Sequence, residues 1–318
     1  MFLWSCDTKK PAQYPLQQAD LSNRTLRIMH DLSADDMQGR EAGEPGGVKA
    51  RTYLLNTLKE MNIPAGFARG YEQPFTAELR NWIGFAYDAP GVNLLAKIEG
   101  ESGSGQSLLI SAHYDHEGKR WGRIYNGADD NASGVAALFA IAEAFQKEKP
   151  KHTMYLAFLD AEEEGLQGAF HFAEQMEREN LGCVAFNINL DMISRNHDNE
   201  LYVAGGYHTP ELKPYLNNLA EEVPVTLLQG HDRPEDGGGD WTMQSDHGAF
   251  HDAGVPFLYF GVEDHPHYHQ PSDEFETVPF DFYLRAVETV VAASKMVDEN
   301  LPDMGRACGE SATSQNDG

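Results

Sequence analysis

Five short apolar stretches most constrain what this chain can fold into, because each runs with little alternation between apolar and polar residues. They are VNLLAKI, SLLISA, MYLAFL, VAFNINL and FLYF, at residues 92–98, 107–112, 154–159, 184–190 and 257–260. Continuous apolar runs of this length are typical of strands that are covered on both faces, as in a parallel sheet. The sequence therefore predicts a buried, largely parallel sheet.

Stretches with helical character lie around and between these strands. Leu54, Leu58 and Met61 recur at helical spacing within residues 48–61. Further helices are predicted at residues 21–32, 134–148, 165–179 and 282–299. Strands that alternate with helices define an α/β fold, here a mostly parallel, mixed central sheet with helices on both faces.

The length of 318 residues is compatible with one α/β domain, which we expect over residues 18–300. Residues 301–318 contain little that a core would bury and are predicted to be a disordered tail. The balance of 24 basic against 50 acidic residues gives a net charge of −26, which repels phosphate backbones, so no nucleic-acid partner is expected. No apolar run approaches the roughly 20 residues of a transmembrane helix, so no transmembrane segment is expected.

The three cysteines, Cys6, Cys183 and Cys308, are too few for a disulfide framework, and no pair is predicted. Cys183 begins an apolar run, where a buried thiol is expected.

The N-terminal segment 1–17 begins with MFLWSC, which resembles the end of a bacterial lipoprotein signal with Cys6 as the lipidated residue. Its apolar part is shorter than the roughly 7 to 15 residues that an export signal needs, so we interpret the segment as a remnant of one. This predicts an extracytoplasmic, periplasmic location and leaves a cytoplasmic one open.

Polar side chains gather where the predicted strands end. His113 and Asp115 follow one strand, Glu162 and Glu163 the next, and Asp191 a third; a loop with His265, His267 and His269 follows the last, and Asp129 and Asp130 precede a helix. Ligands of α/β sheets bind beyond the carboxyl ends of the strands. Because imidazole nitrogen and carboxylate oxygen are donors that zinc accepts, the pattern predicts a metal site.

Each of these residues also has an ordinary interpretation. An aspartate before a helix, such as Asp130, is most often an N-cap, consecutive glutamates often form a solvated face, and a histidine-rich loop is often on the surface. Their shared position at one end of the sheet favours the metal site over these separate interpretations.

Five motifs in order, HYD, GADDNASG, EEEGLQG, NLDMI and YHQPSD, resemble those of the zinc aminopeptidases of the M28 family of metallopeptidases. The resemblance spans residues 21–298. It extends to GREAGEPGG and SDHGAF, which are similar to family landmarks.

The resemblance implies two zinc ions per chain, and it implies a role for each motif residue. The implied ligands are His113, Asp129, Glu163, Asp191 and His269, with Asp129 bridging the metals and a cis peptide bond between Asp129 and Asp130. Asp115 would orient His113, in line with the rule that a ligating histidine gives its other N–H to a carboxylate. Glu162 would be the general base.

Other residues of these motifs have weaker assignments. His267 is the alternative to His269, and His265, before Pro266, is interpreted as structural. His116 is interpreted as exposed, and Asp246 and His247 are expected to border the substrate pocket without a defined role.

The family resemblance implies a metal-dependent exopeptidase, an aminopeptidase that hydrolyses the N-terminal peptide bond of peptide substrates with a dinuclear zinc-activated hydroxide. A mono-zinc glutaminyl cyclase is the alternative from a similar fold. The implied ligands also leave carboxypeptidase or dipeptidase action open. A catalytically inactive binding protein is a further alternative, although such a protein would be expected to lack some of the ligands.

Overall fold

The computed structural model describes residues 23–80 and 84–308. The predicted export remnant with Cys6, and residues 309–318 of the predicted tail, lie outside the described residues.

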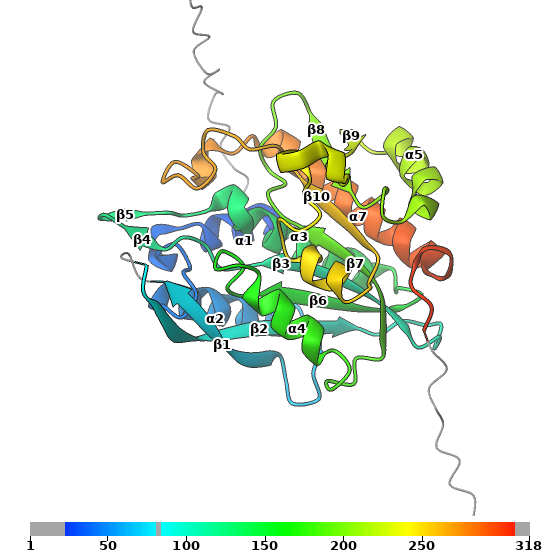
Figure 1. The fold of residues 1–318 in the computed structure, drawn as a ribbon, viewed down its shortest axis with the longest axis horizontal. Coiled ribbons are helices and arrows are strands. Elements are labelled where there is room, and N and C mark those ends of the chain that lie inside the picture. Colours follow the sequence, from blue (N-terminus) through cyan, green and yellow to red (C-terminus); the bar gives the residue numbers. More distant parts are fainter. Residues whose placement is uncertain (1–22, 81–83, 309–318) are drawn as a thin grey trace, which may run out of the picture.

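An eight-stranded mixed sheet forms the centre of the fold, in the order β1-β2-β6-β3-β7-β10-β8-β9 (Figure 1). Four inner strands run parallel to one another, and β2 and β8 join them antiparallel. The inner strands are β6 (Thr153–Leu159), β3 (Gln106–His113), β7 (Cys183–Leu190) and β10 (Phe257–Gly261). The others are β1 (Glu72–Arg80), β2 (Ala86–Ile98), β8 (Glu200–Ala204) and β9 (Thr226–Gln229). The predicted mostly parallel, mixed sheet is confirmed.

Helices cover both faces of this sheet, as predicted (Figure 1). One face carries α1 (Arg24–Leu32), α2 (Pro45–Glu60), α3 (Gly134–Lys147) and α7 (Phe280–Met304), and α5 (Lys213–Glu222) packs against α7. The other face carries α4 (Gln167–Gln175) and α6 (His247–Asp252). Neighbouring strand residues alternate between the two cores, so that Leu94 packs with the first set of helices and Leu95 with the second.

Short elements complete the described part of the chain. A hairpin of β4 (Lys119–Arg120) and β5 (Arg123–Ile124) follows β3. Single turns of 3-10 helix lie at Asp35–Met37, Pro210–Leu212 and Phe275–Thr277. A longer 3-10 segment, Pro234–Gly239, is interrupted at Gly237. An irregular helical turn at Ala128–Ser133 precedes α3.

Local sequence explains where the first helices begin. The side chain of Asn23 accepts hydrogen bonds from the backbone N–H groups of Thr25 and Leu26, which caps α1. Pro45 opens α2, where its fixed φ suits the first helical turn. Leu54 and Leu58, from which the helical spacing was inferred, are buried in the core.

The C-terminal residues correct two sequence predictions. The helix α7 continues to Met304, and Leu301 and Met304 are buried, so a disordered tail from residue 301 is wrong for residues 301–308. Cys183 is not a free thiol, because it forms a disulfide with Cys308. These two residues are 125 positions apart in sequence, and their proximity follows from the packing of α7 against β7, which cysteine spacing does not reveal.

The four parallel inner strands place their carboxyl ends along one edge of the sheet (Figure 1). His113 is the last residue of β3, and Asp191 follows β7 directly. Within the described ranges, no helix is both long and apolar enough to cross a membrane.

Candidate metal centre

Two groups of metal-binding side chains meet at the carboxyl edge of the sheet. In the first group, Nε2 of His113 lies 3.3 Å from Oδ1 of Asp130 and 3.3 Å from Oδ1 of Asp191. In the second group, Nε2 of His269 lies 3.1 Å from Oδ2 of Asp130 and 3.2 Å from Oε2 of Glu163. Asp130 therefore presents one carboxylate oxygen to each group.

The distances between these donor atoms fit zinc. Two ligands bound at about 2.0–2.1 Å in tetrahedral geometry lie about 3.3 Å apart. The separations of 3.1 to 3.3 Å in both groups match that value. Imidazole nitrogens and carboxylate oxygens are also donor types that zinc accepts, so each group is suited to hold one ion.

Asp130, and not Asp129, lies in these groups. Oδ1 of Asp129 accepts hydrogen bonds from the backbone N–H and the hydroxyl of Ser194, both at 2.7 Å. Oδ2 of Asp129 is 2.8 Å from Nε2 of His265. The cis peptide bond lies between Asp130 and Asn131, so the prediction of a cis bond after Asp129 was one residue too early.

A buried arginine holds the loop that carries Asp130. The Arg40 guanidinium is completely buried and donates hydrogen bonds to backbone carbonyl oxygens, among them those of Asn126, Gly127 and Asp130. Burial lowers the pKa of Arg40 to about 10. The motif GREAGEPGG contains this residue, but nothing in that motif indicated which loop the arginine would contact.

A second positioning residue, Asp273, comes from the motif YHQPSD. Its Oδ2 accepts hydrogen bonds from the backbone N–H groups of Asp129 at 2.9 Å and Asp130 at 3.1 Å. Its Oδ1 accepts a hydrogen bond from Nε of Arg195 at 2.8 Å. The motif was expected to supply His269, and the role of Asp273 was not predicted.

Asp115 lies behind the first donor group. Its Oδ1 is 3.6 Å from Nδ1 of His113, and its backbone carbonyl is closer to that nitrogen, at 3.2 Å. The same carboxylate accepts hydrogen bonds from the backbone N–H groups of Glu162 and Glu163, at 3.1 and 3.3 Å. Asp115 thus contacts one predicted ligand and fixes the backbone of another.

Glu162 lies beside the first group without joining either. Its Oε2 is 4.0 Å from Nε2 of His113. Burial raises the pKa of Glu162 well above its usual range, and the carboxylates of Asp191 and Glu163 add to this effect. The result is a carboxylate near the donor groups that binds a proton more readily than an exposed glutamate does.

Charges within the second group stabilise one another. Although burial opposes it, the imidazoles of His116 and His269 lower the pKa of Glu163 to about 2. Burial likewise opposes the charge on His269, but Asp130 and Glu163 raise its pKa to about 11. The metal-free second group therefore pairs ionised acids with protonated imidazole.

Each of the other histidines in the motifs contacts a different partner. His116, interpreted from sequence as exposed, is buried, with Nδ1 2.6 Å from Oε1 of Glu163. Nδ1 of His267 is 3.0 Å from the Ser272 hydroxyl, and His265 contacts Asp129. Of the three histidines in the loop after β10, His269 is the one in a donor group.

Asp246 and His247 are both completely buried. Among the described residues, neither carboxylate oxygen of Asp246 has a hydrogen-bond partner. Burial, together with the charges of Asp115 and Asp191, raises the pKa of Asp246 to about 8. Nε2 of His247 is 2.9 Å from the backbone carbonyl of Trp241, and burial lowers the pKa of His247 to about 3.

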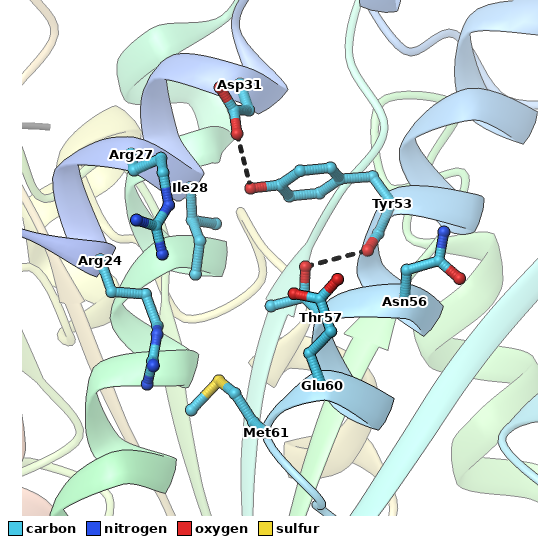
Figure 2. Close-up of a pocket in the computed structure, with 9 residues that line it drawn as sticks. All are labelled: Arg24, Arg27, Ile28, Asp31, Tyr53, Asn56, Thr57, Glu60 and Met61. Carbon is cyan, nitrogen blue, oxygen red and sulfur yellow. Dashed lines mark hydrogen bonds between the residues drawn. The ribbon is translucent and has the colours of Figure 1, made fainter. Parts of the chain in front are cut away.

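A separate cavity of about 340 Å³ lies between α1 and α2 (Figure 2). Tyr53 points into it and donates a hydrogen bond to Asp31 at 3.0 Å, and Arg24 and Arg27 lie on the facing helix. None of the residues that line this cavity belongs to either donor group.

The fold is of the α/β class, and its donor groups are suited to hold metal ions. Residues 93–294 match the family model of Peptidase family M28. The chain therefore belongs to peptidase family M28, and with it to the zinc metallopeptidases.

Individual relatives also resemble this chain in sequence or in fold. Aminopeptidase YwaD of Bacillus subtilis is 27% identical over 200 residues, which cover 58% of this chain and 40% of that relative. The structure of BSAP, a zinc aminopeptidase from Bacillus subtilis, superposes with a TM-score of 0.69 at 15% identity, covering 89% of this chain and 95% of that one. A glutaminyl cyclase from Bacteroides thetaiotaomicron has a TM-score of 0.63 at 17% identity, covering 87% and 98%. The two superpositions show a shared fold.

Proposed function

We propose that this protein is a metal-dependent exopeptidase, an aminopeptidase that hydrolyses the N-terminal peptide bond of peptide substrates. The observation that carries the proposal is the position of Asp130, which presents Oδ1 to His113 and Oδ2 to His269. A carboxylate shared in this way supports a dinuclear centre with two zinc ions per chain. Membership of family M28 supports the peptidase reaction.

The proposed ligands follow the two donor groups. The first zinc would be held by His113, Asp130 and Asp191. The second would be held by Asp130, Glu163 and His269. Asp130 would take the shared place that the sequence motif suggested for Asp129. Three carboxylates then offset most of the four positive charges of two zinc ions, which makes a buried centre tolerable.

Bound zinc would polarise the scissile carbonyl and lower the pKa of a water molecule. Glu162 accepts the proton of the attacking water and passes it to the departing amine, as a general base and then acid. Its raised pKa and its position 4.0 Å from His113, outside both donor groups, support this role. Asp115 orients His113 and holds the backbone of Glu162 and Glu163.

The test uses paired chromogenic substrates. Leucine p-nitroanilide and its N-acetylated form differ only in the free amine, and an aminopeptidase releases p-nitroaniline from the first alone. Removal of metal with a chelator should abolish release, and added zinc should restore it. Cleavage that persists in the metal-free protein, or equal cleavage of the acetylated substrate, would refute the proposal.

Glutaminyl cyclase activity is the second candidate, because a cyclase shares the fold. A glutaminyl peptide separates the two reactions, since cyclisation releases ammonia and keeps the peptide whole, whereas an aminopeptidase releases free glutamine. Carboxypeptidase action would appear as cleavage of peptides whose N-terminus is acetylated. Dipeptidase action would appear as cleavage restricted to peptides of two residues. Donor atoms suited to two metal ions lie together at the centre, which argues against an inactive binding protein.

We also propose an extracytoplasmic location. The disulfide between Cys183 and Cys308 supports it, because disulfides persist mainly in oxidising compartments. Lipid attachment at Cys6 is tested separately by fractionation of cells that make the full chain or its Cys6→Ser variant. Membrane association that depends on Cys6 is the expected result, and two variants with the same distribution would refute the anchor.

A further inference from the structure

His116 is a buried residue beside the second donor group, and its ring nitrogen lies close enough to Asp130 and Glu163 that these three residues could also hold a metal ion. It follows Asp115 in the sequence HYDHEG, and 1% of its surface is exposed. Its Nδ1 lies 2.6 Å from Oε1 of Glu163 and 3.7 Å from Oδ2 of Asp130. The opposite oxygen of Glu163, Oε2, faces His269 at 3.2 Å. Glu163 is therefore held between two imidazoles, one on each oxygen.

The distances distinguish His116 from a metal ligand. Donor atoms that share one tetrahedral zinc lie about 3.3 Å apart. The contact of 2.6 Å between His116 and Glu163 is shorter than that and matches a charge-assisted hydrogen bond. An imidazole that donates to one carboxylate oxygen leaves the other oxygen free to bind metal.

The surroundings of the ring fix its position. A Cβ added at Gly127 would lie 2.5 Å from Cδ2 of His116, so the ring packs directly against the Gly127 backbone. Among the described residues, Nε2 of His116 has no hydrogen-bond partner although it is buried. A proton on Nδ1 satisfies the contact with Glu163 and leaves only a lone pair unpaired, whereas a neutral ring with its proton on Nε2 would bury an unpaired donor.

We propose that His116 is a positioning residue for Glu163, and that its Nδ1–H holds the Glu163 carboxylate so that Oε2 faces the second metal site. The inference rests on the proposed dinuclear function. Loss of this hydrogen bond frees the carboxylate to rotate, which weakens the second site. The first site, built from His113, Asp130 and Asp191, should lose less affinity than the second, because Glu163 is not one of its donors.

Two variants of similar polarity separate this role from a general packing role. In His116→Asn the amide nitrogen occupies about the position of Nδ1 and can still donate to Glu163. In His116→Gln the amide nitrogen reaches the position of Nε2, on the side away from Glu163. We measure zinc binding to the metal-free proteins by competition with a chromophoric chelator, together with the bound zinc per chain.

The expected result is two zinc ions in the wild type and a weaker second site in His116→Gln. Loss of a residue that orients a ligand lowers metal affinity by about 10- to 100-fold. His116→Asn should bind zinc nearly as well as the wild type. Equal losses in both variants, or no loss in either, would overturn the inference.

A measurement on the wild type avoids dependence on variants that fail to fold. In protein with ¹⁵N-labelled histidine and ¹¹³Cd in place of zinc, His113 and His269 should show coupling between nitrogen and cadmium. His116 should show a protonated Nδ1 and no coupling. Coupling at His116 would make it a ligand and refute the positioning role. A wild type that binds fewer than two ions would instead refute the dinuclear proposal, whatever the variants show.

Discussion

Asp129 and Asp130 are adjacent in sequence, yet their carboxylates have separate partners. Asp129 contacts Ser194 and His265, whereas Asp130 faces His113 through one oxygen and His269 through the other. The Asp129 carboxylate therefore supports the loops around the centre, whereas the Asp130 carboxylate lies among the candidate metal ligands.

Asp130→Asn should lose zinc from both sites and reduce kcat by at least about 100-fold, because a shared oxygen donor is removed from each site. Asp129→Asn is the matched control. It should retain zinc and lose about 1–3 kcal/mol of stability, since a buried hydrogen-bonded carboxylate is replaced. Zinc content and chemical unfolding of both variants provide the measurement. If Asp129→Asn bound no zinc while Asp130→Asn kept both ions, Asp129 and not Asp130 would be the shared ligand.

Glu162→Gln should keep both zinc ions and lower kcat by about 10²- to 10⁴-fold, because the amide cannot accept the proton of the attacking water. The control is Glu164→Gln, which changes the third glutamate of the same motif and should leave kcat close to that of the wild type. Steady-state kinetics with leucine p-nitroanilide compares them. Full activity in Glu162→Gln would show that another group is the base.

Cys308→Ser should destabilise the oxidised protein by about 2–4 kcal/mol, because the disulfide to Cys183 restricts the unfolded chain. Reduction of the wild type should lower its stability to nearly that of the variant. The reduced variant should show no further change, which controls for other effects of the reductant. Urea unfolding with and without reductant measures this, and an oxidised wild type no more stable than Cys308→Ser would contradict it.

Asp246→Asn should stabilise the metal-free protein at pH 8. The pKa of Asp246 is raised from its ordinary value of 3.8 to about 8, mainly by burial. Between those values the folded state retains a proton that the unfolded state has lost, so stability falls as the pH rises through this window. The amide has no such titration.

The difference in unfolding free energy between Asp246→Asn and the wild type should therefore grow from pH 5 to pH 8. Relief of a buried, unpaired carboxylate corresponds to about 1–3 kcal/mol. Urea unfolding of the metal-free proteins at several pH values measures the difference. A difference that is constant across this range would show that Asp246 titrates normally.

The buried part of the fold was predictable because continuous apolar runs mark strands with helices on both faces. The edge strands β1 and β9, and β8 next to β9, were not predicted. β1 alternates exposed and buried residues, and β8 and β9 are short, so none presents a continuous apolar run. The tail was misjudged because Leu301 and Met304 continue the buried stripe of α7 past Asn300, where the helix is irregular.

In the site, as in the fold, features fixed by the local sequence were predictable, and features fixed by contacts between distant segments were not. In the structure His113 lies beside Asp191, and Glu163 lies beside His269. The motifs implied these four residues as metal ligands, and that role stays a prediction. The choice between Asp129 and Asp130 depends on the backbone direction within the loop, which two identical neighbouring residues do not reveal. Arg40 and His116 are polar, and their burial follows from acceptors supplied by distant segments.

The most direct test of the account is the amount of zinc bound per chain in the purified protein, measured by elemental analysis alongside leucine p-nitroanilide cleavage. We expect two zinc ions per chain, loss of cleavage when both are removed, and recovery of cleavage when zinc is added back. A single tightly bound ion in the fully active protein, or activity without metal, would contradict it.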